Sequence, residues 1–256
     1  MADEWAQLYD AEMNRRNLIA ILAATPFARP AFAAPEWQVS LIGGGLQGGS
    51  YLAGLRIMLE PGWKTYWRVP GEAGVPPQIK VTGDNVESFE ILSPLPMRIT
   101  DESGEAIGYH DEVVFLLSVK PKDITQPVSA AISAFFGVCQ NICKPAKFDG
   151  TLELKPEPNS ADPVLAAWQD KLPKMATFVG HAQQKDSELV LTLKTPVSDI
   201  FVEGPDSLYF RKPSFQAHTA VLKIDGLQKG ETLKGKELRC TATMQGKGLE
   251  QTITVS

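Results

Sequence analysis

The residues of this chain that are best suited to chemistry are its cysteines, and two of the three lie close together. Cys139 and Cys143 are separated by three residues, whereas Cys240 has no cysteine near it in the sequence. Paired thiols can form a disulfide, exchange electrons with another thiol pair, or bind a soft metal ion such as Cu(I). If Cys139 ends one strand and Cys143 begins the next, their Cα atoms lie about 4.5–5.5 Å apart, a separation that a disulfide can span. A disulfide across a short hairpin is therefore geometrically reasonable.

The ring that such a disulfide closes is very small. On the loop-entropy account it would stabilise the fold less than a bridge across a long segment. A small ring near a hairpin tip is instead reduced easily and is within reach of a partner's thiolate. We therefore favour redox exchange at Cys139 and Cys143, with a structural disulfide and a metal site as open alternatives. We expect no cofactor and no bound metal, and we expect Cys240 to be a buried small apolar residue.

The composition argues against several classes of function. The net charge is -5 and we find no cluster of lysine and arginine, which argues against a nucleic-acid partner. Three histidines and scattered carboxylates form no recognisable hydrolase triad. The chain is 43% hydrophobic, enough for a real core, and its 19 prolines and 21 glycines are spread along its length. That pattern is typical of short strands joined by turns, so the expected fold class is all-β.

The segment 13–34 has the pattern of a signal peptide. It combines a basic start, an apolar run over residues 18–24 and a small-residue cleavage site that ends at Ala34. The apolar run is far shorter than the roughly 20 residues of a membrane-spanning helix. We expect an exported protein with no transmembrane segment after cleavage, and residues 1–12 to be a leader or an over-called start. The Sec and twin-arginine export routes both stay open.

Within residues 36–156, the segment 51–59 alternates apolar and polar side chains, which predicts a half-buried strand, and further short strands follow between prolines and glycines. The glycine-rich stretch 43–50 lacks the ending of a phosphate-binding loop, and we interpret it as a hairpin loop. The segment 128–139 could open a helix after Pro127, but its apolar residues recur at every second position, which predicts a strand. The strands predicted in this domain are 37–42, 51–59, 78–82, 89–92, 113–119 and 128–139.

A polar, proline-rich stretch follows and is the best linker in the chain. We assign residues 157–175 to a linker with a short helix, because Asp162-Pro163 can cap a helix whose apolar residues include Leu165 and Trp168. Residues 176–256 are predicted to form a second, smaller β-sandwich-like domain. Its predicted strands are 188–193, 200–202, 208–210, 220–224, 237–244 and 251–255.

Three motifs carry a resemblance to a known family. They are the run Pro-Gly-Trp-Lys-Thr-Tyr-Trp-Arg-Val-Pro-Gly at 61–71, the pair Gly108-Tyr109, and the cysteine motif 139–145 with the strand-like segment 148–154. Together they resemble the N-terminal periplasmic domain of the thiol:disulfide interchange protein DsbD and its ScsB relatives. The resemblance covers about residues 36–156. It implies an immunoglobulin-like β-sandwich in the periplasm, with the cysteine pair on adjacent strands.

The resemblance also implies a role for the cysteine pair. In that family the pair takes electrons from a membrane-embedded thiol reductase of the DsbD or CcdA kind and passes them to periplasmic thioredoxin-fold proteins through mixed disulfides. Cys139 and Cys143 match that redox pair, and we expect Cys143 to be the cysteine that is attacked first. A cap loop covers the disulfide in the family, and the matching stretch 94–108 holds no phenylalanine here. The residues expected around the pair are Trp63, Tyr66, Trp67, Asp101, Glu102 and Tyr109.

The resemblance implies that the chain is a component of a protein-disulfide reductase, since the chain lacks the family's transmembrane and thioredoxin parts. Whether it is an enzyme in its own right stays open. One rival is a Cu(I)-binding or copper-tolerance protein that uses the two cysteines with His110, His181 or His218. The other is a non-catalytic β-sandwich that binds a partner and has a structural disulfide.

Overall fold

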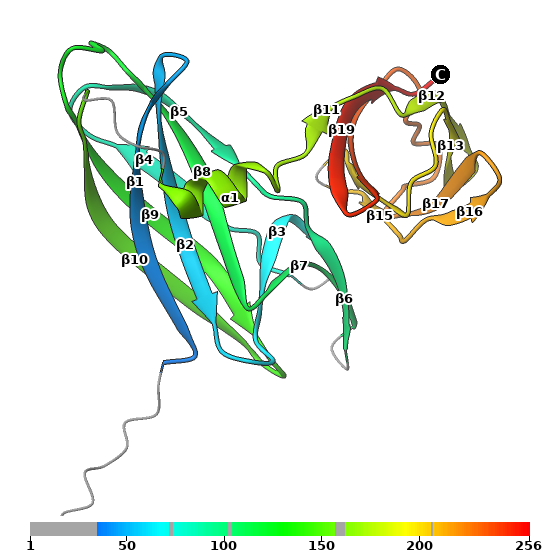
Figure 1. Cartoon of the computed structure of the whole chain (residues 1–256). Coiled ribbons are helices and arrows are strands. Elements are labelled where there is room, and N and C mark those ends of the chain that lie inside the picture. The colour runs from blue at the N-terminus through cyan, green and yellow to red at the C-terminus, as the bar shows by residue number, and fades with distance from the viewer. Residues whose placement is uncertain (1–34, 72–73, 102–103, 157–161, 206) are drawn as a thin grey trace, which may run out of the picture. The chain divides into compact units, whose positions relative to one another are not determined.

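The computed structural model of the protein describes residues 35–71, 74–101, 104–156, 162–205 and 207–256 (Figure 1). The predictions for the leader 1–12, the signal peptide 13–34, Glu102 and linker residues 157–161 lie outside these ranges. The described residues form nineteen strands and one helix, which confirms the all-β fold class. Among them, no helix combines the length and the apolar character that crossing a membrane requires.

Ten strands form the first β-domain. Their bounds are β1 (Trp37–Gln47), β2 (Ser50–Leu59), β3 (Lys64–Gly71), β4 (Gln78–Thr82), β5 (Val86–Leu92), β6 (Met97–Asp101), β7 (Gly104–His110), β8 (Glu112–Pro121), β9 (Val128–Cys139) and β10 (Cys143–Leu154). One sheet has the order β1-β2-β8-β5, and the other has the order β10-β9-β3-β7-β6 with β4 paired to β9. Trp67, Phe115 and Phe136 are almost fully buried in a core to which both sheets contribute. This is the expected immunoglobulin-like sandwich.

The glycine-rich stretch between the first two strands differs from the prediction of a hairpin loop. Strand β1 continues through most of it to Gln47, and only Gly48 and Gly49 form the turn, both with positive φ. The register of β1 on β2 shifts between Gly43 and Leu46. A Cβ atom on Gly44 would lie 2.4 Å from the carbonyl oxygen of Leu52. Glycine is therefore needed at this position so that the two strands can pack closely. In the sequence, a glycine needed for packing looks the same as a glycine of a loop.

The hairpin of β9 and β10 confirms the strand prediction for residues 128–139. Its register is unbroken from Leu154 opposite Val128 to Cys143 opposite Cys139. Side chains of β9 alternate between buried and less buried positions along most of the strand, as the period-2 pattern requires. The unbroken register places the two cysteines directly opposite each other at the end of the hairpin.

Strands β6 and β7 pair with each other and were not predicted from the sequence. We call them the cap hairpin. Strand β7 also pairs with β3, with Thr65 opposite Tyr109 and Tyr66 opposite Gly108. Because β3 pairs with β9 next to Cys139, the cap hairpin is one strand removed from the cysteines.

The second β-domain begins after a short helix, α1 (Pro163–Gln169), whose first turn is capped by Asp162 as expected. Its strands are β11 (Lys174–Met175), β12 (Val179–Lys185), β13 (Glu188–Leu193), β14 (Asp199–Glu203), β15 (Tyr209–Phe210), β16 (Ser214–Gln216), β17 (Thr219–Asp225), β18 (Glu237–Met244) and β19 (Lys247–Thr254). They form two sheets, β11-β19-β18-β14 and β12-β13-β17-β15, with β16 paired to β17. A separate apolar core that includes Phe178, Leu191 and Leu222 lies between them.

Candidate functional site

The two paired cysteines form a disulfide at the end of the β9–β10 hairpin. Cys139 is the last residue of β9 and Cys143 is the first of β10, and their Cα atoms lie 4.1 Å apart. The two cysteines differ in environment, because Cys139 is only 1% exposed whereas Cys143 is exposed. Of the two residues, Cys143 therefore presents more surface to solvent.

A tyrosine hydroxyl lies against both sulfur atoms. The Tyr66 Oη is 2.9 Å from the Sγ of Cys139 and 3.2 Å from the Sγ of Cys143. A disulfide sulfur has no hydrogen, so the hydroxyl is the donor in this contact. Burial, together with the negative charge of Asp101, raises the pKa of Tyr66 above its usual value. The phenol therefore keeps its proton at neutral pH and can donate a hydrogen bond to sulfur.

An ion pair lies next to this cluster. Lys64 is opposite Cys139 in the pairing of β3 with β9, and directly opposed residues place their side chains on the same face of a sheet. Its side chain is almost completely buried, and its ammonium group is paired with the carboxylate of Asp101 from the cap hairpin. The charge of Asp101 also acts on the phenol of Tyr66. The site therefore contains a buried positive charge and a negative charge beside the disulfide.

Sequence reasoning did not select Lys64. A signal was present, because Lys64 and Tyr66 are two residues apart and therefore point to one face of β3. Because Tyr66 was expected near the disulfide, Lys64 on the same face could have been predicted to lie near it too.

The cap hairpin covers the buried sulfur with aliphatic side chains. Ile99 and Ala106 pack with Tyr66 and Cys139 in a small buried cluster that is distinct from the main core. The described residues of the stretch 94–108 that pack in this cluster are thus aliphatic, and the stretch holds no phenylalanine. Since the cluster includes Cys139 and leaves Cys143 exposed, the covering acts on one sulfur of the pair.

The other aromatic residues expected around the pair lie at different places. Trp63 is half-buried, and the ammonium of Lys144 lies 5.1 Å from its ring centre. Trp67 is fully buried and packs edge-on against Phe201 of the second β-domain, with 5.8 Å between ring centres. Tyr109 is buried in the main core and donates a hydrogen bond from its hydroxyl to the carbonyl oxygen of Pro94 at 2.8 Å. Among the predicted aromatic residues, Tyr66 is the one with a described contact to the sulfur atoms.

The third cysteine lies outside this site. Cys240 belongs to β18 and is fully buried in the core of the second β-domain, which confirms the expectation of a buried apolar residue. Burial, with a smaller contribution from the negative charge of Glu203, raises the pKa of its thiol to about 12. The thiol is therefore protonated at neutral pH and a poor nucleophile.

The copper-binding alternative needs a third ligand near the cysteines. The described residues contain no group of three or more histidines, cysteines or acidic residues arranged to hold a metal ion. The Nδ1 atom of His110 lies 3.1 Å from the carbonyl oxygen of Trp63. That contact occupies one of the two ring nitrogens of His110.

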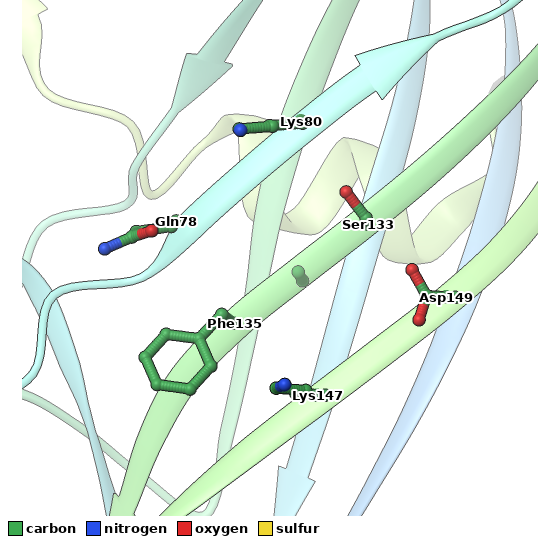
Figure 2. A pocket seen from close by; sticks show the side chains of 7 residues that line it. Gln78, Lys80, Ser133, Phe135, Lys147 and Asp149 are labelled. Carbon is green, nitrogen blue, oxygen red and sulfur yellow. The ribbon is translucent and has the colours of Figure 1, made fainter.

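A shallow pocket lies further along the same hairpin. It has a volume of about 220 Å³ and is formed on the outer side of β4, β9 and β10 (Figure 2). Its lining residues are Gln78, Lys80, Ser133, Ala134, Phe135, Lys147 and Asp149. Neither cysteine lines it, and its mixed charges are typical of a solvent-facing sheet. The disulfide therefore lies outside this pocket.

Comparison with known proteins agrees with the fold. Residues 33–152 match the family model described as thiol:disulfide interchange protein DsbD, N-terminal. A search of curated protein sequences gives no significant match.

Two solved structures are similar to the chain. The N-terminal periplasmic domain of ScsB from Proteus mirabilis has 24% sequence identity and a TM-score of 0.67, over 87% of this chain and 94% of that one. The DsbD N-terminal domain of Neisseria meningitidis in its reduced form has 15% identity over 46% of this chain and 90% of that one, with a TM-score of 0.25, too low to support an argument. The ScsB match shows a shared fold across both β-domains. Residues 33–152 form a thiol:disulfide interchange domain of the DsbD N-terminal family.

Proposed function

We propose that this protein is a periplasmic thiol–disulfide exchange protein that carries electrons through Cys139 and Cys143. The electrons come from a membrane-embedded thiol reductase of the DsbD or CcdA kind and go to periplasmic thioredoxin-fold proteins. The observation that carries the proposal is the asymmetry of the disulfide, in which Cys143 is exposed and Cys139 is buried against a tyrosine hydroxyl. The family of residues 33–152 and the signal-like segment 13–34 support the same function and location.

Reduction begins with attack on the exposed sulfur. A thiolate of the donor attacks the Sγ of Cys143, the bond to the Sγ of Cys139 breaks, and Cys139 leaves as a thiolate with the bonding electron pair. The donor and Cys143 are now joined by a mixed disulfide. The second thiolate of the donor attacks the donor's own sulfur in this bond and releases Cys143 as a thiolate. The donor is oxidised to a disulfide, and this protein has gained two electrons.

Delivery to the acceptor runs the same steps in the opposite direction. The thiolate of Cys143 attacks the acceptor's disulfide and releases one acceptor thiolate. Cys139 then attacks the Sγ of Cys143, which restores the intramolecular disulfide and releases the second acceptor thiolate. Cys139 is thus the leaving group in one direction and the resolving nucleophile in the other.

The groups around Cys139 suit these two roles. The hydroxyl of Tyr66 is already within hydrogen-bond distance of its sulfur and can donate to the thiolate that forms. A hydrogen bond to the charged form lowers the pKa of an acidic group, and a thiol of lower pKa leaves more readily. We therefore assign Tyr66 to the stabilisation of the Cys139 thiolate.

Trapping of mixed disulfides tests the order of attack. Reduced Cys139→Ser should form a stable mixed disulfide with an oxidised thioredoxin-fold protein, because the exposed Cys143 attacks and no resolving thiol remains. Reduced Cys143→Ser should form little adduct, since its remaining thiols, Cys139 and Cys240, are buried. Non-reducing gel electrophoresis and mass spectrometry measure both adducts. Equal adduct formation by the two variants, or stronger trapping by Cys143→Ser, would contradict the assignment.

The apolar side chain between the cysteines is expected to contact the protein partner. Ile142 is 75% exposed, next to the exposed Cys143. Burial of an isoleucine side chain contributes about 1.5–3 kcal/mol, so Ile142→Asp should slow exchange with a thioredoxin-fold protein about tenfold or more. Reduction by dithiothreitol should change little, because this small thiol has no apolar surface to bury.

A matched control is Ile124→Asp, which alters another exposed isoleucine that lies outside the hairpin. Stopped-flow kinetics with the protein partner and with dithiothreitol give the two rates. Docking through Ile142 is excluded if Ile142→Asp and Ile124→Asp react with the protein partner at the same rate.

A further inference from the structure

The cap hairpin has two faces, and they meet different parts of the molecule. Ile99 and Ala106 belong to the face that packs on Tyr66 and Cys139. Their neighbours Arg98 and Glu105 point to the opposite face, because successive residues of a strand alternate between its two sides. The outer face thus carries an arginine and a glutamate directly behind the two residues that cover the buried sulfur.

Arg98 connects this outer face to the second β-domain. Its Nε donates to both carboxylate oxygens of Asp199, at 3.1 and 2.9 Å, and its Nη2 donates to the carbonyl oxygen of Ile200 at 2.9 Å. Its guanidinium carbon lies 5.0 Å from the ring centre of Phe201. The side chain of Arg98 is only 7% exposed. Three consecutive residues of β14 therefore surround one arginine of the cap hairpin.

Glu105 makes a second connection between the cap hairpin and the second β-domain, and it also contacts Arg98, which makes the first. Its Oε1 accepts a hydrogen bond from Nη1 of Arg98 at 2.8 Å and another from the hydroxyl of Tyr209 at 3.1 Å. Burial, followed by the charge of Glu105, raises the pKa of Tyr209 to about 12, so its hydroxyl remains a donor at neutral pH. Both strands of the cap hairpin are thus attached to the second β-domain by hydrogen bonds that involve a charged group. Such bonds are about twice as strong as neutral ones.

We propose that the second β-domain holds the cap hairpin closed over Cys139, with Arg98, Asp199 and Tyr209 as positioning residues that direct exchange to Cys143. This inference rests on the proposed function, which makes Cys143 the attacked sulfur. It gives the second β-domain a task in the exchange reaction, although the structure records no contact between that domain's described residues and the disulfide. If the attachment is broken, the cap hairpin opens more often and the sulfur of Cys139 becomes accessible.

The accessibility of Cys139 can be measured without any exchange partner. In Cys143→Ser, the remaining thiol of the site is Cys139, and its alkylation by iodoacetamide reports how often it is exposed. The rate is measured against pH, so that the plateau at high pH reports accessibility and the midpoint reports the pKa of the thiol. Arg98→Gln and Asp199→Asn, each added to Cys143→Ser, should raise the plateau about tenfold or more, as the loss of a hydrogen bond to a charged group would allow.

A matched control removes an arginine–carboxylate pair elsewhere. Arg56→Gln breaks the contact of Arg56 with Glu112, 2.8 Å long, between β2 and β8. It should leave the alkylation plateau unchanged. Amide hydrogen exchange of residues 97–101 and 104–110 in the disulfide form gives a second measurement, which should accelerate in Asp199→Asn and not in Arg56→Gln.

The outcomes separate this inference from the proposed function. Unchanged plateaus and unchanged hydrogen exchange in folded Asp199→Asn would overturn the role of the second β-domain, even if exchange with protein partners works as proposed. If the plateau rises but the protein exchanges with no thioredoxin-fold protein, the proposed function is overturned. The inference that the second β-domain holds the cap hairpin closed then still stands. If Arg98→Gln does not fold, Asp199→Asn and the milder Tyr209→Phe still decide the question, with a smaller rise expected for Tyr209→Phe.

Discussion

Lys64→Met should raise the pKa of the Cys139 thiol in the reduced protein by about 1–3 units, the range expected for loss of a nearby opposite charge. Lys64 is buried opposite Cys139 and is paired with Asp101. Methionine keeps an unbranched side chain at this buried position but removes the positive charge. Loss of this charge, with the negative charge of Asp101 still present, disfavours the thiolate.

The same substitution should slow reduction of the disulfide about tenfold, because a leaving thiol of higher pKa departs more slowly. The pKa is measured from the pH dependence of iodoacetamide alkylation in the Cys143→Ser background, and the rate from reduction by dithiothreitol in the otherwise unaltered protein. Lys80→Met, an exposed lysine of β4, serves as the control and should change neither quantity.

A second substitution checks that the effect is electrostatic. Asp101→Asn alone should lower the pKa of the Cys139 thiol, and Lys64→Met combined with Asp101→Asn should return it toward the value of the parent protein. If the pKa of the Cys139 thiol in the double variant stays as high as in Lys64→Met, the change arises from altered packing. The assignment of the effect to the charge of Lys64 is then wrong.

Gly108→Ala should destabilise the first β-domain by about 2–3 kcal/mol, near the upper range for overpacked sites. Gly108 lies in β7 opposite Tyr66 of β3. A Cβ atom at this position would lie 2.0 Å from the carbonyl oxygen of Thr65, which is a backbone atom and has no rotamer to move into. The added methyl group must therefore separate β7 from β3, the strand that carries Tyr66.

Urea unfolding at equilibrium measures this loss of stability. Gly43→Ala is the control, because Gly43 is also a strand glycine and a Cβ atom there would be 3.4 Å from the nearest atom, a side-chain carbon of Leu152. That variant should stay close to the parent protein. If Gly108→Ala is as stable as Gly43→Ala, β3 and β7 tolerate separation, and close packing of the cap hairpin on β3 is not needed.

The second β-domain makes further contacts with the first. Besides the attachment of Arg98 to β14, the guanidinium of Arg68 contacts the carboxylates of Glu203 and Glu250 at 2.6 and 2.7 Å. Arg68 follows Trp67 on β3, and the ring of Trp67 packs against Phe201. Strand β3 therefore presents Tyr66 to the disulfide and the next two residues to the second β-domain. The division into 36–156, 157–175 and 176–256 stays a prediction.

Local pattern determined much of the secondary structure. The predicted strands 78–82, 128–139, 188–193 and 237–244 have the bounds of β4, β9, β13 and β18. Burial alternates along β4, β13 and most of β9, and along the first half of β18, so a period of two is visible without any tertiary information. The cap hairpin was missed because its second strand is buried at consecutive positions, from Ala106 to Tyr109, and lacks that alternation.

The sequence by itself determined the cysteine pair, its hairpin, the all-β class and, through its motifs, the family of the first domain. It could not determine which cysteine is buried, that Lys64 lies beside it, or that Arg98 reaches the second β-domain. These features depend on contacts between residues far apart in the chain, such as Arg98 with Asp199. A disulfide between neighbours in one hairpin follows from local register, whereas its reactivity depends on which strands pack over each sulfur, and only the tertiary structure decides that.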